Sequence, residues 1–267
     1  MKRATLVNQI KKKKSFLCVG LDVDLDKIPP HLLKYKNPLL EFNKAIIEAT
    51  QDLCVAYKPN IAFYEAYGTM GWEALNKTME LIPEDIFTIA DAKRGDIGNT
   101  ADRYAHAFFK QMNFDAVTLN PYMGKDCIAP FLKYEDKWAI VLGLTSNQGS
   151  EDFQMMQDEN GETLYERVIR IAASWGTTSN TMFVVGATKA DYIEKIRKIS
   201  PNHFYLVPGV GAQGGSLQAV CNAGKNTDIG LLINSTRGII YQSKGKDFAE
   251  KAREAALQLQ KEMAFQI

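Results

Sequence analysis

Three charged residues close together in the chain, Asp91, Lys93 and Asp96, have the types and spacing for acid–base or electrostatic chemistry. They follow an apolar run at 86–90, which predicts a buried strand. Because side chains two residues apart on a strand point to the same side, we expect Asp91 and Lys93 to project together from its end. A solvated turn with surface ion pairs is the alternative for this stretch taken alone. Keeping such charges together is costly unless each has a partner or a task, so the stretch is a candidate reaction centre.

The chain after this charged stretch is expected to turn and enter a helix. Gly95 and Gly98 permit a sharp turn. Asn99 or Thr100 can then cap a helix that begins near Ala101. The charged residues therefore lie where a strand runs into a helix.

Short apolar runs alternate with amphipathic stretches along the whole chain. The expected strands cover residues 16–22, 54–58, 86–91, 116–120, 139–145, 182–187, 204–208 and 229–234. Helical patterns lie between them, and the last expected helix covers 248–263. Eight strand–helix units in about 250 residues predict an α/β fold, a single (β/α)8 TIM barrel that forms one domain over residues 1–267. A doubly wound open sheet is the alternative, but it usually has fewer strands.

Polar residues close or follow the first five expected strands. They are Asp22, Lys58, Asp91 with Lys93, Asn120, and Ser146 with Asn147. Each could alone be a cap or a turn residue. In a TIM barrel, active sites lie at the C-terminal ends of the strands. The sequence therefore predicts that these side chains converge on one barrel mouth.

Two later segments suit a phosphate group. The seventh expected strand runs into a stretch with four glycines at 209–215, and a helix is expected to begin near Ser216. Backbone N–H groups and the positive end of that helix can face an anion there. Arg237 follows the eighth strand and offers a planar fork that suits phosphate. Barrels commonly bind phosphate after strands seven and eight, so we expect a phosphate site here rather than flexible turns.

Composition excludes several other classes of protein. A formal net charge of +1 gives no reason to expect nucleic acid or an anionic membrane as partner. No apolar stretch reaches the ~20 residues needed to span a bilayer, and the N-terminus lacks the apolar core of a signal peptide. The four cysteines are far apart and form no C-x-x-C pair, which favours reduced thiols in the cytoplasm. The three histidines show no ligand spacing, so no metal site is expected.

Taken together, these residues resemble the orotidine 5′-phosphate decarboxylase family over nearly the whole chain. The family's Asp-x-Lys-x-x-Asp hallmark at the end of strand three is present as Asp91, Lys93 and Asp96. The flanking segments 20–22, 58–59 and 208–211, together with Gln213 and Arg237, also agree. The segments 55–60, 118–124 and 143–147 are similar to the longer bacterial branch of that family.

The resemblance implies a homodimeric barrel that converts orotidine 5′-monophosphate to UMP and CO2 in pyrimidine biosynthesis, with no metal and no organic cofactor. It implies that Lys93 is the proton donor and that Asp91 faces the substrate carboxylate. Lys58 and Asp96 would complete an alternating array of charges. Asp96 and Thr100 would reach into the partner subunit's site, so the active sites would be shared.

The resemblance also implies the substrate contacts. Asp22 and Lys58 would hold the ribose hydroxyls. Either Ser146 or Asn147 would contact the pyrimidine. Gln213 and Arg237 would hold the phosphate, and the expected substrate-binding set is completed by Asn120, Pro208 and Gly209. The loop after strand seven is shorter than in better-known relatives, so either that loop or the polar segment 146–161 is the expected lid.

Three other functions remain open from the residues. A Schiff-base aldolase acting on a sugar phosphate could use Lys58 or Lys93, but it gives no reason for the aspartates on both sides of Lys93. A magnesium-dependent sugar-phosphate decarboxylase or synthase on the same barrel is the second. A barrel that only senses a nucleotide phosphate, binding UMP without turnover, is the third.

Overall fold

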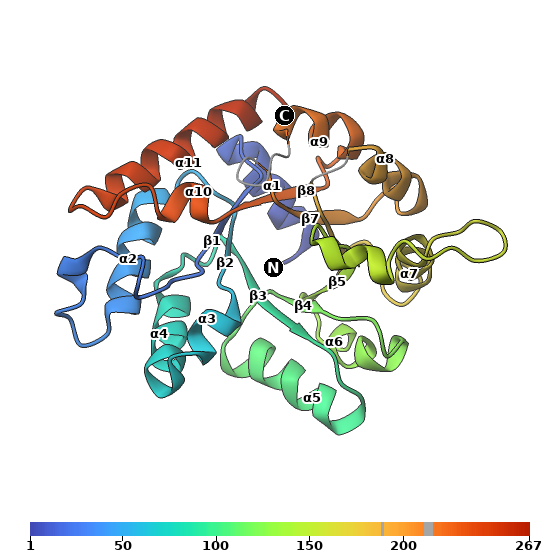
Figure 1. Ribbon diagram of the computed structural model, residues 1–267, viewed down its shortest axis with the longest axis horizontal. Coiled ribbons are helices and arrows are strands. Elements are labelled where there is room, and N and C mark those ends of the chain that lie inside the picture. The colour runs from blue at the N-terminus through green and yellow to red at the C-terminus, as the bar shows by residue number, and fades with distance from the viewer. Residues whose placement is uncertain (188–189, 211–215) are drawn as a thin grey trace.

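Parallel strands close into a barrel in the computed structural model, which describes residues 1–187, 190–210 and 216–267 (Figure 1). The strand order follows the chain, and β8 pairs with β1 to close the ring. The strands are β1 Leu17–Gly20, β2 Ala56–Lys58, β3 Phe87–Arg94, β4 Ala116–Leu119, β5 Trp138–Leu144, β6 Thr181–Val185, β7 Phe204–Pro208 and β8 Leu231–Ser235. The predicted (β/α)8 barrel is confirmed.

Helices surround the ring of strands on its outer side (Figure 1). The α-helices are α1 Arg3–Lys13, α2 Pro38–Thr50, α3 Ile61–Glu65, α4 Gly68–Leu81, α5 Gly98–His106, α6 Ala129–Leu132, α7 Leu164–Ala172, α8 Ala190–Ile199, α9 Leu217–Gly224, α10 Arg237–Ile240 and α11 Phe248–Ala264. Short helical turns are η1 Pro30–Leu32, the π-helical η2 Ala107–Gln111, η3 Lys125–Cys127 and η4 Gln148–Asp152. Because helices cover the barrel outside and side chains fill it inside, strands such as β1 and β6 are buried along their whole length.

The start of α5 differs from the sequence prediction. The helix begins at Gly98, and Ile97 is its N-cap residue. Gly98 has a φ of +57°, a left-handed conformation that suits glycine, but residues 95–97 before it form no turn or bend, so the sharp turn expected there is not seen. The helix starts sooner than expected, which places Asn99 and Thr100 inside its first turn. The prediction that one of them caps a helix beginning near Ala101 was therefore wrong.

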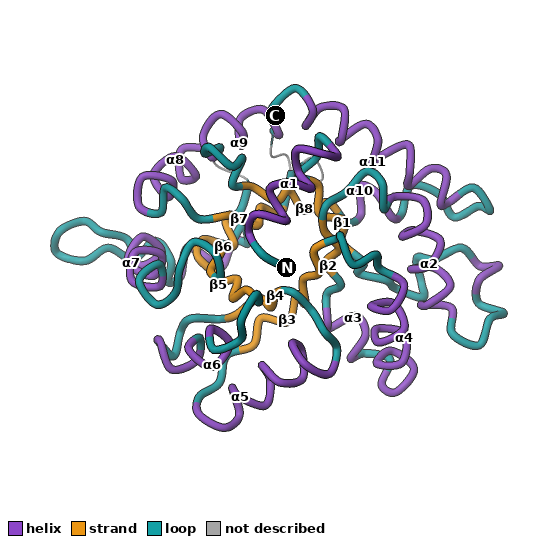
Figure 2. Tube along the Cα trace, turned by 180° about the vertical axis from the view of Figure 1, so that it is seen from behind, coloured by secondary structure: helices purple, strands orange, loops and turns teal. Residues whose placement is uncertain are grey.

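Helix α1 lies across the N-terminal end of the barrel (Figure 2). The Met1 ammonium donates a 2.5 Å hydrogen bond to Asp115, just before β4, and the Trp138 indole at the start of β5 donates to the Met1 carbonyl. Arg3 forms an ion pair with Asp228, which precedes β8. These contacts cover one end of the barrel, so the other end, where the strands terminate, is the one left for a site.

His203, just before β7, is a buried histidine whose two ring nitrogens have no hydrogen-bond partner among the described residues. Its ring packs against Phe183, with the ring centroids 5.3 Å apart. Burial, together with the positive charges of Arg3 and Arg197, lowers the pKa of His203 to about 4. The folded protein therefore holds this ring neutral at pH values where an exposed histidine takes up a proton.

We expect this buried ring to make the protein less stable in mild acid. The pKa of His203 is lower in the folded chain than the value of 6.5 of an unfolded one, so its contribution to stability is complete above pH 6.5 and is lost as the pH falls toward 4. The difference between the two pKa values corresponds to about 3 kcal/mol. Urea unfolding of the wild type and of His203→Phe between pH 7 and pH 4 tests this. The variant loses no hydrogen bond and should lack this part of the pH dependence.

The control is His106→Gln, which also removes one imidazole, here an exposed one of α5 that is hydrogen bonded to Gln111, and which should keep the loss of stability that His203→Phe lacks. An equally steep loss of stability in His203→Phe would show that other groups cause the acid sensitivity.

Candidate active site

A line of alternating charges lies at the C-terminal ends of the first three strands. Lys58, the last residue of β2, donates a 2.8 Å hydrogen bond from Nζ to Oδ2 of Asp91. The other carboxylate oxygen of Asp91, Oδ1, accepts a 2.6 Å hydrogen bond from Lys93 Nζ. Asp22, just after β1, has its Oδ1 4.0 Å from Lys58 Nζ. The structure therefore brings together four residues that the sequence predicted for the barrel mouth.

Strand β3 reaches this point through a bulge rather than as a regular strand. Ala90 pairs with Val117 and Arg94 pairs with Leu119, so three β3 residues stand opposite one residue of β4. Lys93 has a φ of +48°, the left-handed region that a lysine rarely adopts. The prediction that Asp91 and Lys93 lie together is confirmed, because their side chains are hydrogen bonded. The reason given for it, the alternation of side chains along a regular strand, was wrong, because both residues lie in a bulge.

The charges in this line stabilise one another. Burial alone would raise the pKa of Asp91, but the ammonium groups of Lys58 and Lys93 outweigh it and hold the pKa well below its usual value. Burial likewise opposes the charge on Lys58, but Asp22 and Asp91 raise its pKa above the usual value. Burial raises the pKa of Asp22, and Lys58 opposes this shift. Asp91 and Lys58 are therefore both charged at neutral pH.

A cavity of about 390 Å3 opens above these charges. Its lining includes five of the predicted site residues, namely Asp22, Lys58, Asp91, Pro208 and Gly209. A sixth is Arg237, the first residue of α10, which is exposed and makes no hydrogen bond or ion pair with any residue that the structure describes. Gln213 lies outside the described residues. The cavity thus has Asp22, Lys58 and Asp91 on the same walls as an unpaired guanidinium. Lys93 does not line it and reaches it only through its hydrogen bond to Asp91.

Two glycines permit close backbone packing around the site, and one of them, Gly209, lines the cavity. Gly209 has a φ of +96°, which a residue with a side chain rarely adopts. At Gly20, a Cβ atom would stand 1.8 Å from Oγ1 of Thr236, so only glycine lets β1 and the end of β8 pack together here. Both lie in segments that the sequence linked to the site.

The other predicted site residues do not line this cavity. Asp96 Oδ1 accepts a hydrogen bond from the next backbone N–H, and Thr100 is exposed on α5. The Asn120 side chain accepts from the backbone of Tyr122 and so closes its own turn. Among the described residues, no hydrogen bond or ion pair joins the side chains of these three residues to the charged line.

Ser146 and Asn147 line a separate hollow of about 110 Å3 beyond the end of β5. Asn147 Oδ1 accepts a 2.6 Å hydrogen bond from the Thr145 hydroxyl, and the Ser146 backbone packs closely on Gly186. The structure does not distinguish which of the two contacts a pyrimidine, so that alternative stays a prediction.

Sequence reasoning missed several residues of the site, among them Thr118, Tyr241 and Lys27. Thr118 of β4 is buried against Asp91 and Lys93, to which it is hydrogen bonded. Tyr241 and Lys27 line the cavity, and the Tyr241 hydroxyl donates to the Asp22 carbonyl. Thr118 was part of a segment that resembled the family, so its polar side chain in a buried strand was a usable signal. Tyr241 and Lys27 lie in helical and loop segments with no comparable signal.

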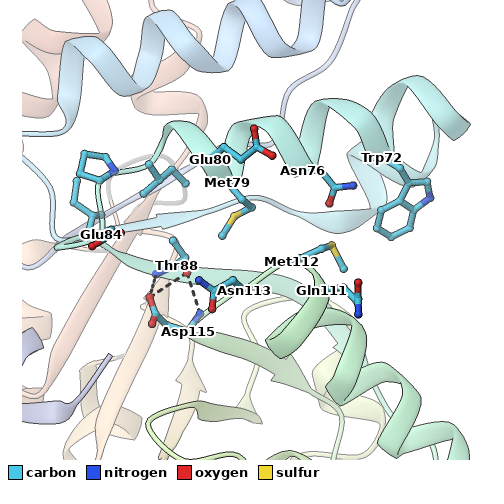
Figure 3. Close-up of a pocket in the computed structure, with 13 residues that line it drawn as sticks. Trp72, Asn76, Met79, Glu80, Glu84, Thr88, Gln111, Met112, Asn113 and Asp115 are labelled. Atoms are coloured by element: carbon cyan, nitrogen blue, oxygen red, sulfur yellow. Dashed lines mark hydrogen bonds between the residues drawn. The ribbon is translucent and has the colours of Figure 1, made fainter.

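A larger hollow lies elsewhere, between α4, η2 and the start of β3, with a volume of about 950 Å3 (Figure 3). Figure 3 shows Trp72, Met79 and Met112 around it, and its lining also includes Glu80 and Glu84. Its 13 lining residues include no lysine or arginine, so it does not suit a phosphate. The chemistry of the side chains, rather than the size of the hollow, places the site at the barrel mouth.

The described ranges contain neither a candidate metal site nor a candidate membrane span. There, no three or more His, Cys, Asp or Glu side chains are grouped so that they could hold a metal ion. The expected lack of a metal requirement stays a prediction. No helix in these ranges is long and apolar enough to cross a membrane.

Comparison with known proteins identifies the family. A protein of Flavobacterium johnsoniae named orotidine 5′-phosphate decarboxylase is 62% identical over 97% of this chain and 96% of its own. One of Bacteroides fragilis with the same name is 56% identical over 100% and 98%. The solved structure of Leishmania donovani OMP decarboxylase is 38% identical, with a TM-score of 0.83 and 99% of both chains covered.

The match to the family itself covers most of the barrel. Residues 15–254 match the family described as orotidine 5′-phosphate decarboxylase / HUMPS. This range includes every strand from β1 to β8 and every predicted site residue. The chain belongs to the orotidine 5′-phosphate decarboxylase family.

Proposed function

We propose that this chain decarboxylates orotidine 5′-monophosphate to UMP and CO2 in pyrimidine biosynthesis, with Lys93 as the proton donor. The observation that carries the proposal is the Lys93 ammonium, which is held by Asp91 at 2.6 Å at the barrel mouth while half of its side chain stays exposed. When the bond from C6 to the carboxylate breaks, its electron pair stays on C6 and the ring cannot delocalise it. A fixed ammonium can stabilise that charge and then supply the proton that forms the C6–H bond.

Asp91 supports this reaction because it stays ionised. The pKa of Asp91 is held below its usual value by Lys58 and Lys93, so it is a carboxylate whenever substrate binds at neutral pH. It would face the substrate's own carboxylate, and the repulsion between the two would be relieved as CO2 leaves. Lys58 keeps Asp91 in place from the other side.

Groups around the cavity offer what the rest of the nucleotide needs. Asp22 Oδ1 is buried and has no hydrogen-bond partner among the described residues, so it can accept a ribose hydroxyl. Arg237 offers an unpaired guanidinium to the phosphate. Gly209 brings backbone close to the same cavity. Binding energy from the distant phosphate can then be used to order the groups at C6.

We also infer a homodimer with shared active sites. Asp96 and Thr100 leave their own cavity and lie on the rim of the barrel. Three exposed apolar side chains share that rim, with exposed fractions of 54% for Ile97, 90% for Tyr122 and 46% for Met123. An apolar rim of this kind favours contact with a second copy of the chain.

Two further expectations are retained as proposals. The reaction needs no organic cofactor or metal, because the charged line itself supplies the stabilising ammonium.

The location is proposed from the cysteines. All four are free and buried, namely Cys18, Cys54, Cys127 and Cys221, which supports a reducing, cytoplasmic location.

The aldolase alternative fits the site less well. A lysine that forms a Schiff base needs a lowered pKa, because the neutral amine is the nucleophile. The pKa of Lys58 is raised instead, and its ammonium is buried against Asp91. Both features favour a permanent charge at this position.

The first test follows loss of ultraviolet absorbance from orotidine 5′-monophosphate with EDTA-treated protein. We expect the wild type to turn over and Lys93→Ala to lose activity while still binding UMP. Loss of one preorganised electrostatic partner costs about 3–4 kcal/mol, and loss of the proton donor adds to it. The control is Lys77→Ala, which removes an ammonium paired with Glu73 at 2.7 Å on the outer helix α4 and should keep full activity. Near-normal turnover by a folded Lys93→Ala protein contradicts the mechanism.

The second test concerns the phosphate. Arg237→Ala should strongly raise KM for the nucleotide and barely change the weak activity on a substrate that lacks the phosphate. Lys27→Ala is the control, because the Lys27 ammonium in the same cavity is already paired with Asp24 at 2.8 Å and should matter less. If Arg237→Ala loses activity equally on both substrates, the residue supports the fold rather than the phosphate.

The third test concerns the shared sites. Asp96→Ala and Lys93→Ala should each be inactive alone and should complement each other when co-expressed. Random pairing gives about half mixed dimers, each with one intact site, so about a quarter of wild-type activity should return. Verified subunit exchange with no return of activity would mean that Asp96 serves its own subunit.

A further inference from the structure

Thr118 of β4 occupies a special position opposite the bulge of β3. The pairs Ala90 with Val117 and Arg94 with Leu119 leave the three residues 91–93 facing Thr118 alone. The Thr118 side chain is buried. Both residues of β3 that carry the proposed chemistry lie in this bulge, so Thr118 is the β4 residue nearest to them in register.

The hydrogen bonds of Thr118 connect these two residues in a fixed direction. The backbone N–H of Lys93 donates to Thr118 Oγ1 at 2.9 Å. The hydroxyl therefore acts as the acceptor there, and its one proton is free to go to Asp91 Oδ1, at 3.0 Å. One hydroxyl thus binds the main chain of the proposed proton donor and the carboxylate that orients its ammonium.

The backbone of Lys93 needs such a contact. Its φ of +48° is disfavoured for a residue with a side chain and persists only where the surroundings hold it. The bulge also breaks the regular β3–β4 ladder at this point. The Thr118 hydroxyl supplies the hydrogen bond to the Lys93 N–H within this interrupted part of the ladder.

We propose that Thr118 is a positioning residue for the decarboxylation, which fixes the Asp91 carboxylate and the Lys93 main chain relative to each other. The inference rests on the proposed function. As Lys93 gives its proton to C6 it becomes a neutral amine, and its hold on Asp91 Oδ1 weakens. Thr118 still binds Oδ1 while Lys58 binds Oδ2, so the carboxylate keeps its orientation through the step.

The same pair of strands offers a matched control at the other end of the barrel. The hydroxyl of Thr88 in β3 accepts a 2.9 Å hydrogen bond from the Asp115 backbone N–H and donates to Asp115 Oδ2 at 3.1 Å. This repeats the Thr118 arrangement, with one threonine hydroxyl between a backbone N–H and a carboxylate. Asp115 lies far from the mouth, at the end that α1 covers. Loss of the Thr88 hydroxyl should therefore affect stability without affecting the reaction.

The experiment compares kcat and KM for orotidine 5′-monophosphate in the wild type, Thr118→Val, Thr118→Ser and Thr88→Val. Valine has the shape of threonine without the hydroxyl. We expect Thr118→Val to lose about 100-fold in kcat, as small misplacements of reacting groups do, with KM and UMP affinity nearly unchanged. Thr118→Ser keeps the hydroxyl and should restore most of kcat. Thr88→Val should unfold more easily and keep its kcat. If Thr118→Val does not fold, Thr118→Cys takes its place, since a thiol is only a weak donor and acceptor.

The outcomes separate a failure of the proposed decarboxylation from a failure of the proposed role of Thr118. A wild type that does not consume the nucleotide overturns the proposed function and not only the role of Thr118. An active wild type with an equally active, folded Thr118→Val overturns the role of Thr118 alone. A serine variant as slow as the valine variant, or a Thr88→Val with the same kcat loss, shows a general effect on the fold and also overturns it.

Discussion

The buried ion pair between Lys58 and Asp91 is the constraint on which the mouth of this barrel depends. A buried ammonium is costly unless carboxylates face it, and Lys58 has Asp91 at 2.8 Å and Asp22 at 4.0 Å. These groups come from the ends of three neighbouring strands, so the pair needs β1, β2 and β3 in one register. The pairing of Gly20 with Lys58 and the bridge of Asn60 with Asp91 provide that register.

The barrel was predictable because its pattern is repeated and local. Each buried strand reads as an apolar run, and the order of strands and helices leaves few topologies open. The local detail at Lys93 was not predictable in the same way. Its positive φ depends on how β3 pairs with β4, a tertiary contact that no window of sequence contains. The early start of α5 is a local feature instead, since Ile97 is its N-cap residue and Gly98, with a φ of +57°, is its first residue.

In the site, too, some residues could be predicted from the sequence and others could not, and the difference is whether they lie at strand ends or in turns. Residues at strand ends, such as Lys58 and Asp91, meet as predicted because the barrel fixes where a strand ends. Asn120 follows a strand as well, yet its side chain binds the backbone of its own turn. Polar residues in turns often make such local bonds, so strand-end position alone does not place them in a site. Thr118 was missed although its segment resembles the family, because a buried threonine in a strand was taken as part of the core.

Some polar groups of the site have hydrogen-bond or ion-pair partners within the protein and others do not. This difference separates the groups proposed to react from those proposed to bind the nucleotide. The Asp91 carboxylate is fully paired before substrate arrives, because Lys58, Thr118 and Lys93 all bind it. Two other groups of the cavity are not paired in this way, since the buried Asp22 Oδ1 has no hydrogen-bond partner and the exposed Arg237 no ion-pair partner among the described residues. A nucleotide would therefore gain its affinity from these two groups, which have open bonding capacity. The groups at C6 need no rearrangement to hold their charges, and electrostatic stabilisation is largest where the charges are fixed in advance.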